Sequence, residues 1–188
     1  MKISQIQGNY RNNVLGLFLI VFGLFIASCD EVAEILDVEF DINYTSEITV
    51  PASTGINLPL DLFTPEVTTN SEATFGNNNT SKDLIKEITL KSLILTITSP
   101  SSQRFDFLKE ITVYINAEGL GELEIASAKD VADNIGNELE LVVSDNNLQS
   151  YIKKDKFTLR VNAVTDEFIN EDVKIEAAST YHVVANPL

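Results

Sequence analysis

The chain has 188 residues, of which 28 are acidic and 13 are basic, so its formal net charge is −15. Such an acidic chain lacks the basic patches that nucleic-acid binding requires, and we exclude nucleic acid as a partner. One cysteine cannot form an internal disulfide, so we expect the core alone to stabilise the fold.

The chain begins with a segment that is typical of a secretory signal peptide. Val14 to Ile26 is an apolar run of 13 residues, preceded by the basic residues Lys2 and Arg11. As a helix the run would span about 20 Å, which is short of the roughly 30 Å hydrocarbon core of a bilayer. Small residues follow it. This order predicts a leader over residues 1–28 that is removed after Ser28.

The end of this leader resembles the lipobox of bacterial lipoproteins: Ile26-Ala27-Ser28-Cys29 is a branched apolar residue, two small residues and a cysteine. The resemblance implies cleavage between Ser28 and Cys29, a diacylglyceryl group on the Cys29 thiol and N-acylation of the new terminus. Two or three buried chains anchor a protein far more firmly than one. The alternative is an ordinary signal peptide followed by a free thiol.

With this leader removed, the sequence predicts an acidic lipidated tether over 29–37 and a single domain over 38–188. Residues 1–28 hold two basic residues and no acidic one, so the remainder has a formal net charge of −17. A length of this order suits one domain.

The first half of that domain alternates between apolar and polar residues, which predicts strands. The alternation covers 38–50 and 56–62, and Pro59 predicts that the second of these strands lies at a sheet edge. We expect a weaker strand over 67–75 and a loop over 76–81. Ser81 is a candidate N-cap for a short helical turn that ends at Lys86.

The next strand, 88–98, changes its apolar parity near Lys91-Ser92, which predicts either a β-bulge or a strand that moves between sheets. Further strands are expected in the second half, with a turn at Gly119 and Gly121 and a short helix over 147–154. These strands are 111–117, 123–125, 139–143, 157–163 and 173–183.

Eight or nine short strands without βαβ spacing predict an all-β fold, an antiparallel β-sandwich with short helical connectors. It is immunoglobulin-like only by analogy, because the chain has no tryptophan and no cysteine pair. An up-and-down β-barrel is the alternative, since closed barrels show the same alternation.

The segment Ile88 to Ser127 resembles the central part of small lipoproteins from Bacteroidetes-type bacteria. The similar features are a strand that ends at Ser99-Pro100, the Phe105-Asp106-Phe107-Leu108 turn, and a strand followed by Gly119-x-Gly121. This resemblance implies a Gram-negative envelope and no enzymatic activity. Asp30-Glu31 resembles the surface-export signal of such bacteria, whereas in enteric bacteria Asp30 would suggest retention in the inner membrane.

Few residues in the domain suggest chemistry. His182 is expected on the solvent face of its strand, and one histidine cannot make a zinc site without several carboxylates. Asp130, Asp133 and Glu138 lie in a turn-rich segment that could supply oxygens to calcium, although the spacing is not that of an EF-hand and a solvated connector is the alternative. Tyr114 is the one tyrosine on a predicted polar face where a sugar could stack.

We therefore expect a non-enzymatic envelope lipoprotein that serves as a structural or protein-interaction module, anchored through Cys29 and without a cofactor beyond its lipid. Its expected location is the outer membrane, with exposure at the cell surface. The alternative is a β-sandwich module that binds glycan or calcium. The expected partners are the membrane, through the lipid, and an envelope protein or glycan.

Overall fold

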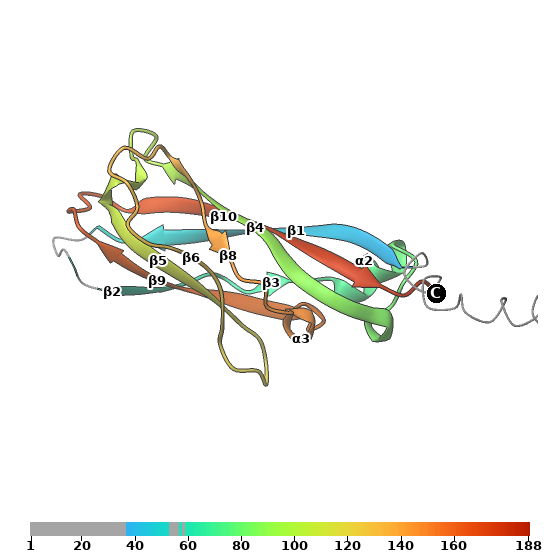
Figure 1. Cartoon of the computed structure of the whole chain (residues 1–188). Coiled ribbons are helices and arrows are strands. Elements are labelled where there is room, and N and C mark those ends of the chain that lie inside the picture. The colour runs from blue at the N-terminus through green and yellow to red at the C-terminus, as the bar shows by residue number, and fades with distance from the viewer. Residues whose placement is uncertain (1–36, 53–56, 58) are drawn as a thin grey trace, which may run out of the picture. The chain divides into compact units, whose positions relative to one another are not determined.

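Two antiparallel sheets pack face to face in the computed structural model, which describes residues 37–52, 57 and 59–188 (Figure 1). Residues Val38–Leu188 form one compact unit. The sheets are not closed into a barrel. The predicted all-β sandwich is therefore confirmed, and the barrel alternative is wrong.

The four-stranded sheet has the order β1–β10–β4–β7. Its strands are β1 (Val38–Val50), β10 (Val173–Ala185), β4 (Ile85–Ser99) and β7 (Glu138–Glu140). β1 and β10 pair over 13 residues without a register shift. The alternation in β1 turns the even-numbered residues inward, with Ile42, Ile48 and Val50 buried, and leaves the odd-numbered residues from Glu39 to Thr49 exposed, as predicted.

The six-stranded sheet has the order β2–β9–β5–β6–β8, and β3 pairs with β9 beside β2. Its strands are β2 (Pro59–Phe63), β9 (Lys156–Thr165), β5 (Leu108–Asn116), β6 (Leu123–Ala128), β8 (Val142–Val143) and β3 (Val67–Thr68). β2 begins at Pro59 and ends the sheet, which confirms the predicted edge strand: proline cannot donate to a second neighbour.

The parity change in β4 is a β-bulge at Lys91. Thr180 lies opposite Ser92 while Tyr181 lies opposite Leu90, so Lys91 is the extra residue. The bulge turns both Leu90 and Leu93 into the core. β4 stays within one sheet; the chain instead changes sheets around Leu141, because β7 pairs with β4 and β8 pairs with β6.

The helical segments are short, and one of them replaces a predicted strand. The prediction of a strand over 67–75 is wrong beyond Thr68, because Asn70 takes a left-handed conformation with φ of 48° and α2 (Ser71–Asn77) follows. This helix places Phe75 in the core with 0% exposure. The remaining segments are η2 (Lys82–Leu84), η3 (Phe105–Phe107) and α3 (Gln149–Ile152).

Three aromatic rings fill the core between the sheets near α2. Tyr44, Phe157 and Tyr181 make edge-to-face pairs with centroid distances of 5.4 Å, 5.7 Å and 6.2 Å. The Tyr44 hydroxyl donates to the carbonyl oxygen of Thr69 at 3.0 Å. The hydroxyl of Tyr181 is buried and has no hydrogen-bond partner within the described chain. Burial raises the pKa of both phenols, that of Tyr44 to about 12.

Candidate functional site

The predicted lipidation and cleavage residues, Cys29 and Ser28, lie outside the described residues, as do the leader and all of the tether except Asp37. The described domain begins at Val38, nine residues after Cys29. A fully extended segment of that length spans about 30 Å. Among the residues that the structure describes, no helix is both long and apolar enough to cross a bilayer.

The three candidate calcium ligands lie on the connection between β6 and β7. Asp130 follows β6 with φ of 51°, Asp133 lies in a turn, and Glu138 begins β7. All three are exposed. Calcium takes six to eight oxygen ligands, and in residues 37–52, 57 and 59–188 no group of three or more His, Cys, Asp or Glu residues gathers as a metal site would. Calcium binding stays a prediction.

Tyr114 lies on the outer face of the six-stranded sheet, as its parity predicts, but one face of its ring is already covered. The guanidinium carbon of Arg160 lies 4.3 Å from the ring centroid, a cation–π contact. Arg160 also donates to Glu122 at 2.9 Å and to Asp61 at 2.7 Å. The hydrogen bond to Glu122 raises the pKa of Arg160 further. A sugar that stacked on this ring face would have to displace Arg160 from its contacts with Tyr114, Glu122 and Asp61.

His182 lies on the outer face of the four-stranded sheet, as predicted, and contacts two carboxylates of β1. Its Nδ1 lies 2.9 Å from Asp41 Oδ1, and its Nε2 lies 3.7 Å from Glu39 Oε2. Lys91, at the bulge, donates to the other oxygen of Asp41 at 2.6 Å. Hydrogen bonds from Lys91 and then His182 lower the pKa of Asp41. These pairs join β1, β10 and β4 on the sheet surface.

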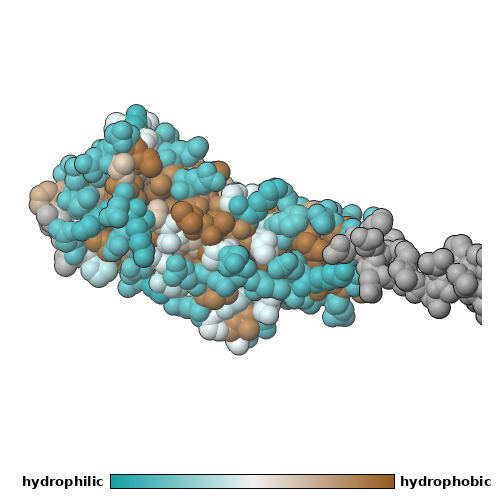
Figure 2. Space-filling view, viewed as in Figure 1, coloured by the Kyte–Doolittle hydropathy of each residue, from teal (hydrophilic) through white to brown (hydrophobic). Residues whose placement is uncertain are grey.

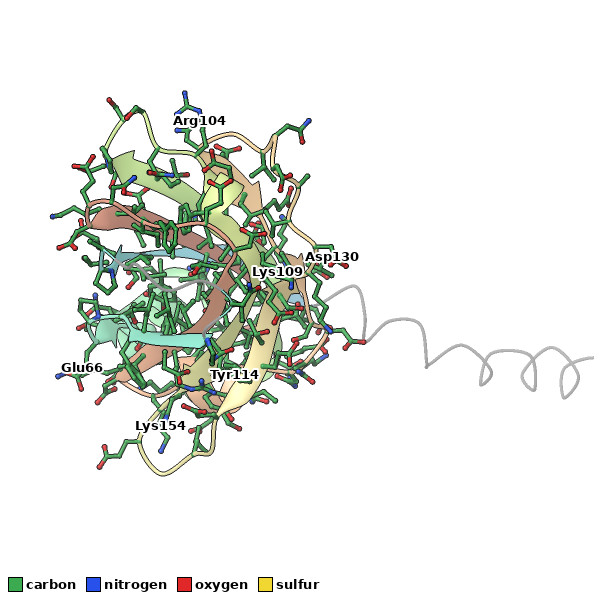
Figure 3. All side chains as sticks on the ribbon, turned by 90° about the vertical axis from the view of Figure 1, so that its left-hand side faces the viewer. Glu66, Arg104, Lys109, Tyr114, Asp130 and Lys154 are labelled. Carbon is green, nitrogen blue, oxygen red and sulfur yellow. The ribbon has the colours of Figure 1, made fainter. Side chains whose placement is uncertain are left out.

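An open, polar hollow of about 630 Å³ lies beside the start of β9. Its charged side chains are Glu66, Glu118, Asp155 and three lysines: Lys153, Lys154 and Lys156. Lys156 donates to Glu66 at 2.7 Å. Figure 3 labels Glu66 and Lys154 on the lower part of the domain, away from Asp130. Charges of both signs and an open shape suit a contact with a polar surface.

Besides this hollow, the domain has a free sheet edge along β1. β1 pairs with β10 on one side, and no strand of the described chain pairs with it on the other. A groove of about 380 Å³ follows this edge, between β1 residues 43–47 and the segment 65–68 that leads into β3. Sequence reasoning missed this edge, because alternation predicts a strand but not which strand ends a sheet. Pro59 gave such a signal for β2, whereas β1 contains neither proline nor lysine.

The face of the domain that Figure 2 shows is largely hydrophilic, with separate apolar areas. Figure 2 shows one such area in the middle of the domain, over the region where Figure 1 labels β8. Val142 of β8 is 76% exposed. Phe63 at the end of β2 and Phe168 between β9 and β10 are also exposed. Single exposed apolar residues of this kind are ordinary on protein surfaces.

Comparisons with known proteins do not assign the chain to a family. No family model matches it, and no curated protein matches it. A solved structure from turnip yellow mosaic virus aligns with 79% of this chain and 96% of its own, at 11% identity and a TM-score of 0.27. A likeness that weak carries no argument about function.

Proposed function

We propose that this chain is a lipid-anchored protein-interaction module of the bacterial cell envelope, attached through Cys29 and without enzymatic activity. The single observation that carries the anchor is the sequence Ile26-Ala27-Ser28-Cys29 directly after the apolar run. Each residue type that lipid attachment and cleavage need is present in the required order. The chain's one cysteine is thereby given a use.

The start of the domain supports an anchored arrangement. Val38 begins β1 only nine residues after Cys29, so a lipid on that cysteine would hold the domain within about 30 Å of the membrane surface. The formal net charge of −17 that residues 29–188 would carry after cleavage opposes flat adsorption on anionic lipid. The lipid, and not the protein surface, therefore supplies the attachment.

The free edge of β1 supports the interaction role. Unpaired backbone groups along an edge strand are a template for pairing with another chain, and natural proteins usually block them. Here a 13-residue strand ends a sheet, and a groove runs beside it. The proposed location is the outer membrane, exposed at the cell surface, in line with the resemblance of Asp30-Glu31 to an export signal.

The experiment that tests the anchor is labelling with radioactive palmitate in a Gram-negative host. We expect the wild-type chain to incorporate label and Cys29→Ser to incorporate none, because the thiol is the site of attachment. Ser28→Ala is the matched control, since it changes the neighbouring residue and keeps it small, and it should label like wild type. A wild-type chain without label, or Cys29→Ser with undiminished label, would contradict the proposal.

A further inference from the structure

The free edge of β1 differs from the other sheet edges in its length and regularity. β1 has 13 residues, whereas the other strands that end sheets in the described chain are β7 with three, β8 with two and β2 with five. β1 pairs with β10 without a bulge. It contains neither proline nor lysine, two residues that commonly protect edges. No strand of the described chain occupies this edge, and the groove leaves it open along residues 43–47.

The groove beside β1 gives an added strand a second surface. It is lined by β1 residues 43–47 and by Pro65, Glu66, Val67 and Thr68. The inward side chains Phe40 and Tyr44 remain half-buried at this edge, whereas Ile48 is 3% exposed. An extended segment laid along β1 would cover these rings and make backbone hydrogen bonds at the same time.

The charges at this edge have one sign. β1, β2 and residues 64–68 carry five acidic side chains and no basic one: Glu39, Asp41, Glu47, Asp61 and Glu66. Their ion-pair partners, such as Lys174 for Glu47 and Lys156 for Glu66, lie on strands farther from the edge. A partner that approaches the edge therefore meets carboxylates first, which favours a cationic segment.

The same charges oppose a second copy of this chain. If two β1 strands paired antiparallel over their full length, residue numbers across the pair would add to 88, which places Asp41 opposite Glu47 twice. Like charges directly opposite each other destabilise a strand pair. The net charge of each copy adds a longer-range repulsion.

We infer that the free edge of β1 binds an extended, lysine- or arginine-bearing segment of another protein, which adds as a fifth strand along residues 43–47 and lies in the groove against Pro65–Thr68. The inference rests on one part of the proposed function, the role as a protein-interaction module. It does not depend on the other part, the lipid at Cys29. Backbone pairing would supply affinity, and basic side chains of the segment would meet Glu47 of β1 and Glu66 across the groove.

The test uses the full chain in detergent and a nine-residue peptide of alternating lysine and valine. Hydrogen exchange is measured at each amide. We expect the peptide to slow exchange in β1 residues 43–47 by about tenfold or more, because amides that faced water become paired, and to slow exchange in residues 66–68, which it would cover. A peptide of alternating glutamate and valine is the sequence-matched control and should leave exchange unchanged.

Two double variants separate the local edge from the overall charge. Glu47→Lys with Glu66→Lys reverses two exposed carboxylates at the groove. Asp130→Lys with Asp133→Lys makes the same change in net charge in exposed residues near the opposite edge, where Figure 3 places Asp130. The groove variant should bind the lysine peptide about tenfold more weakly at low salt, and the control variant should bind it within about threefold of wild type. Circular dichroism checks that both variants fold.

Three results would overturn the inference. The first is no slowing of exchange in β1, or equal slowing by the glutamate peptide. The second is equal weakening by the two double variants, which would assign binding to net charge. The third is protection of β1 that grows with the concentration of the chain alone, which would make a second copy the occupant. Palmitate labelling at Cys29 is a separate readout, so the anchor and the docking edge can fail independently.

Discussion

Replacing the two buried tyrosines by phenylalanine should change stability in opposite directions. Tyr181 is 0% exposed, and its hydroxyl has no hydrogen-bond partner within the described chain. The part-buried hydroxyl of Tyr44 donates to the carbonyl oxygen of Thr69 at 3.0 Å. Both rings belong to one aromatic cluster, with centroids 5.7 Å apart. The two variants therefore differ mainly in whether the hydroxyl that is removed makes a hydrogen bond.

The magnitudes follow from the hydrogen bonds. An unmade bond at a buried polar group costs about 1–3 kcal/mol, and removal of the Tyr181 oxygen recovers part of this while leaving a small void. We expect Tyr181→Phe to raise the free energy of unfolding by about 1 kcal/mol, and Tm by about 3 °C. Tyr44→Phe deletes a made bond and should lower the free energy of unfolding by about 1 kcal/mol.

Urea denaturation at neutral pH measures both variants. In two-state unfolding a change in stability shifts the urea midpoint and leaves unchanged the slope of the free energy of unfolding against urea concentration. An unchanged slope therefore shows that the variants can be compared with wild type. Destabilisation of similar size in both variants would refute the reasoning, since it would show that the Tyr181 hydroxyl makes a favourable interaction in the folded state.

Three other predictions concern the core, the bulge and alkaline pH. Leu93→Ala, at a 0% exposed site, should lower the free energy of unfolding by about 2–5 kcal/mol, and Val142→Ala, at a 76% exposed site, by less than about 0.5 kcal/mol; urea denaturation separates them. Deletion of Lys91 should abolish the cooperative thermal transition in circular dichroism, because part of β4 would turn its apolar face outward, whereas Lys91→Ala keeps the bulge and loses only an exposed ion pair worth less than about 1 kcal/mol. Burial raises the pKa of Tyr44 from 10.0 to about 12, so its neutral form stabilises the fold fully below pH 10 and that contribution is lost as pH rises towards 12. Unfolding in guanidinium chloride at pH 8 and pH 11 measures this loss. Between the two pH values the free energy of unfolding should fall less for Tyr44→Phe than for wild type, and an equal fall would contradict the raised pKa of Tyr44.

The strands were largely predictable, because a half-buried strand must alternate. β1 was predicted with its bounds, and the parity change near Lys91-Ser92 predicted either a bulge or a strand that moves between sheets, of which the structure shows the bulge. The helix at Ser71–Asn77 was missed, since the threonines before it favour strands. Its start follows the left-handed Asn70, and its formation places Phe75 in the core. Local pattern cannot report such a tertiary preference.

The surface sites were less predictable than the strands. The parity of Tyr114 placed it on an outer face, but the arginine that covers its ring comes from β9, which pairs with β5 only in the folded sheet. The free edge of β1 likewise depends on the order of strands from distant parts of the sequence. Cleavage after Ser28 and lipidation of Cys29 remain predictions from sequence, since both residues lie outside the described part of the chain.

Mass spectrometry of the N-terminal peptide of the native product tests the lipid anchor most directly. We predict a chain that begins at Cys29 and whose first residue carries the added mass of a diacylglyceryl group and an acyl chain. An unmodified thiol at Cys29, or a product that still contains residues 1–28, would contradict the account.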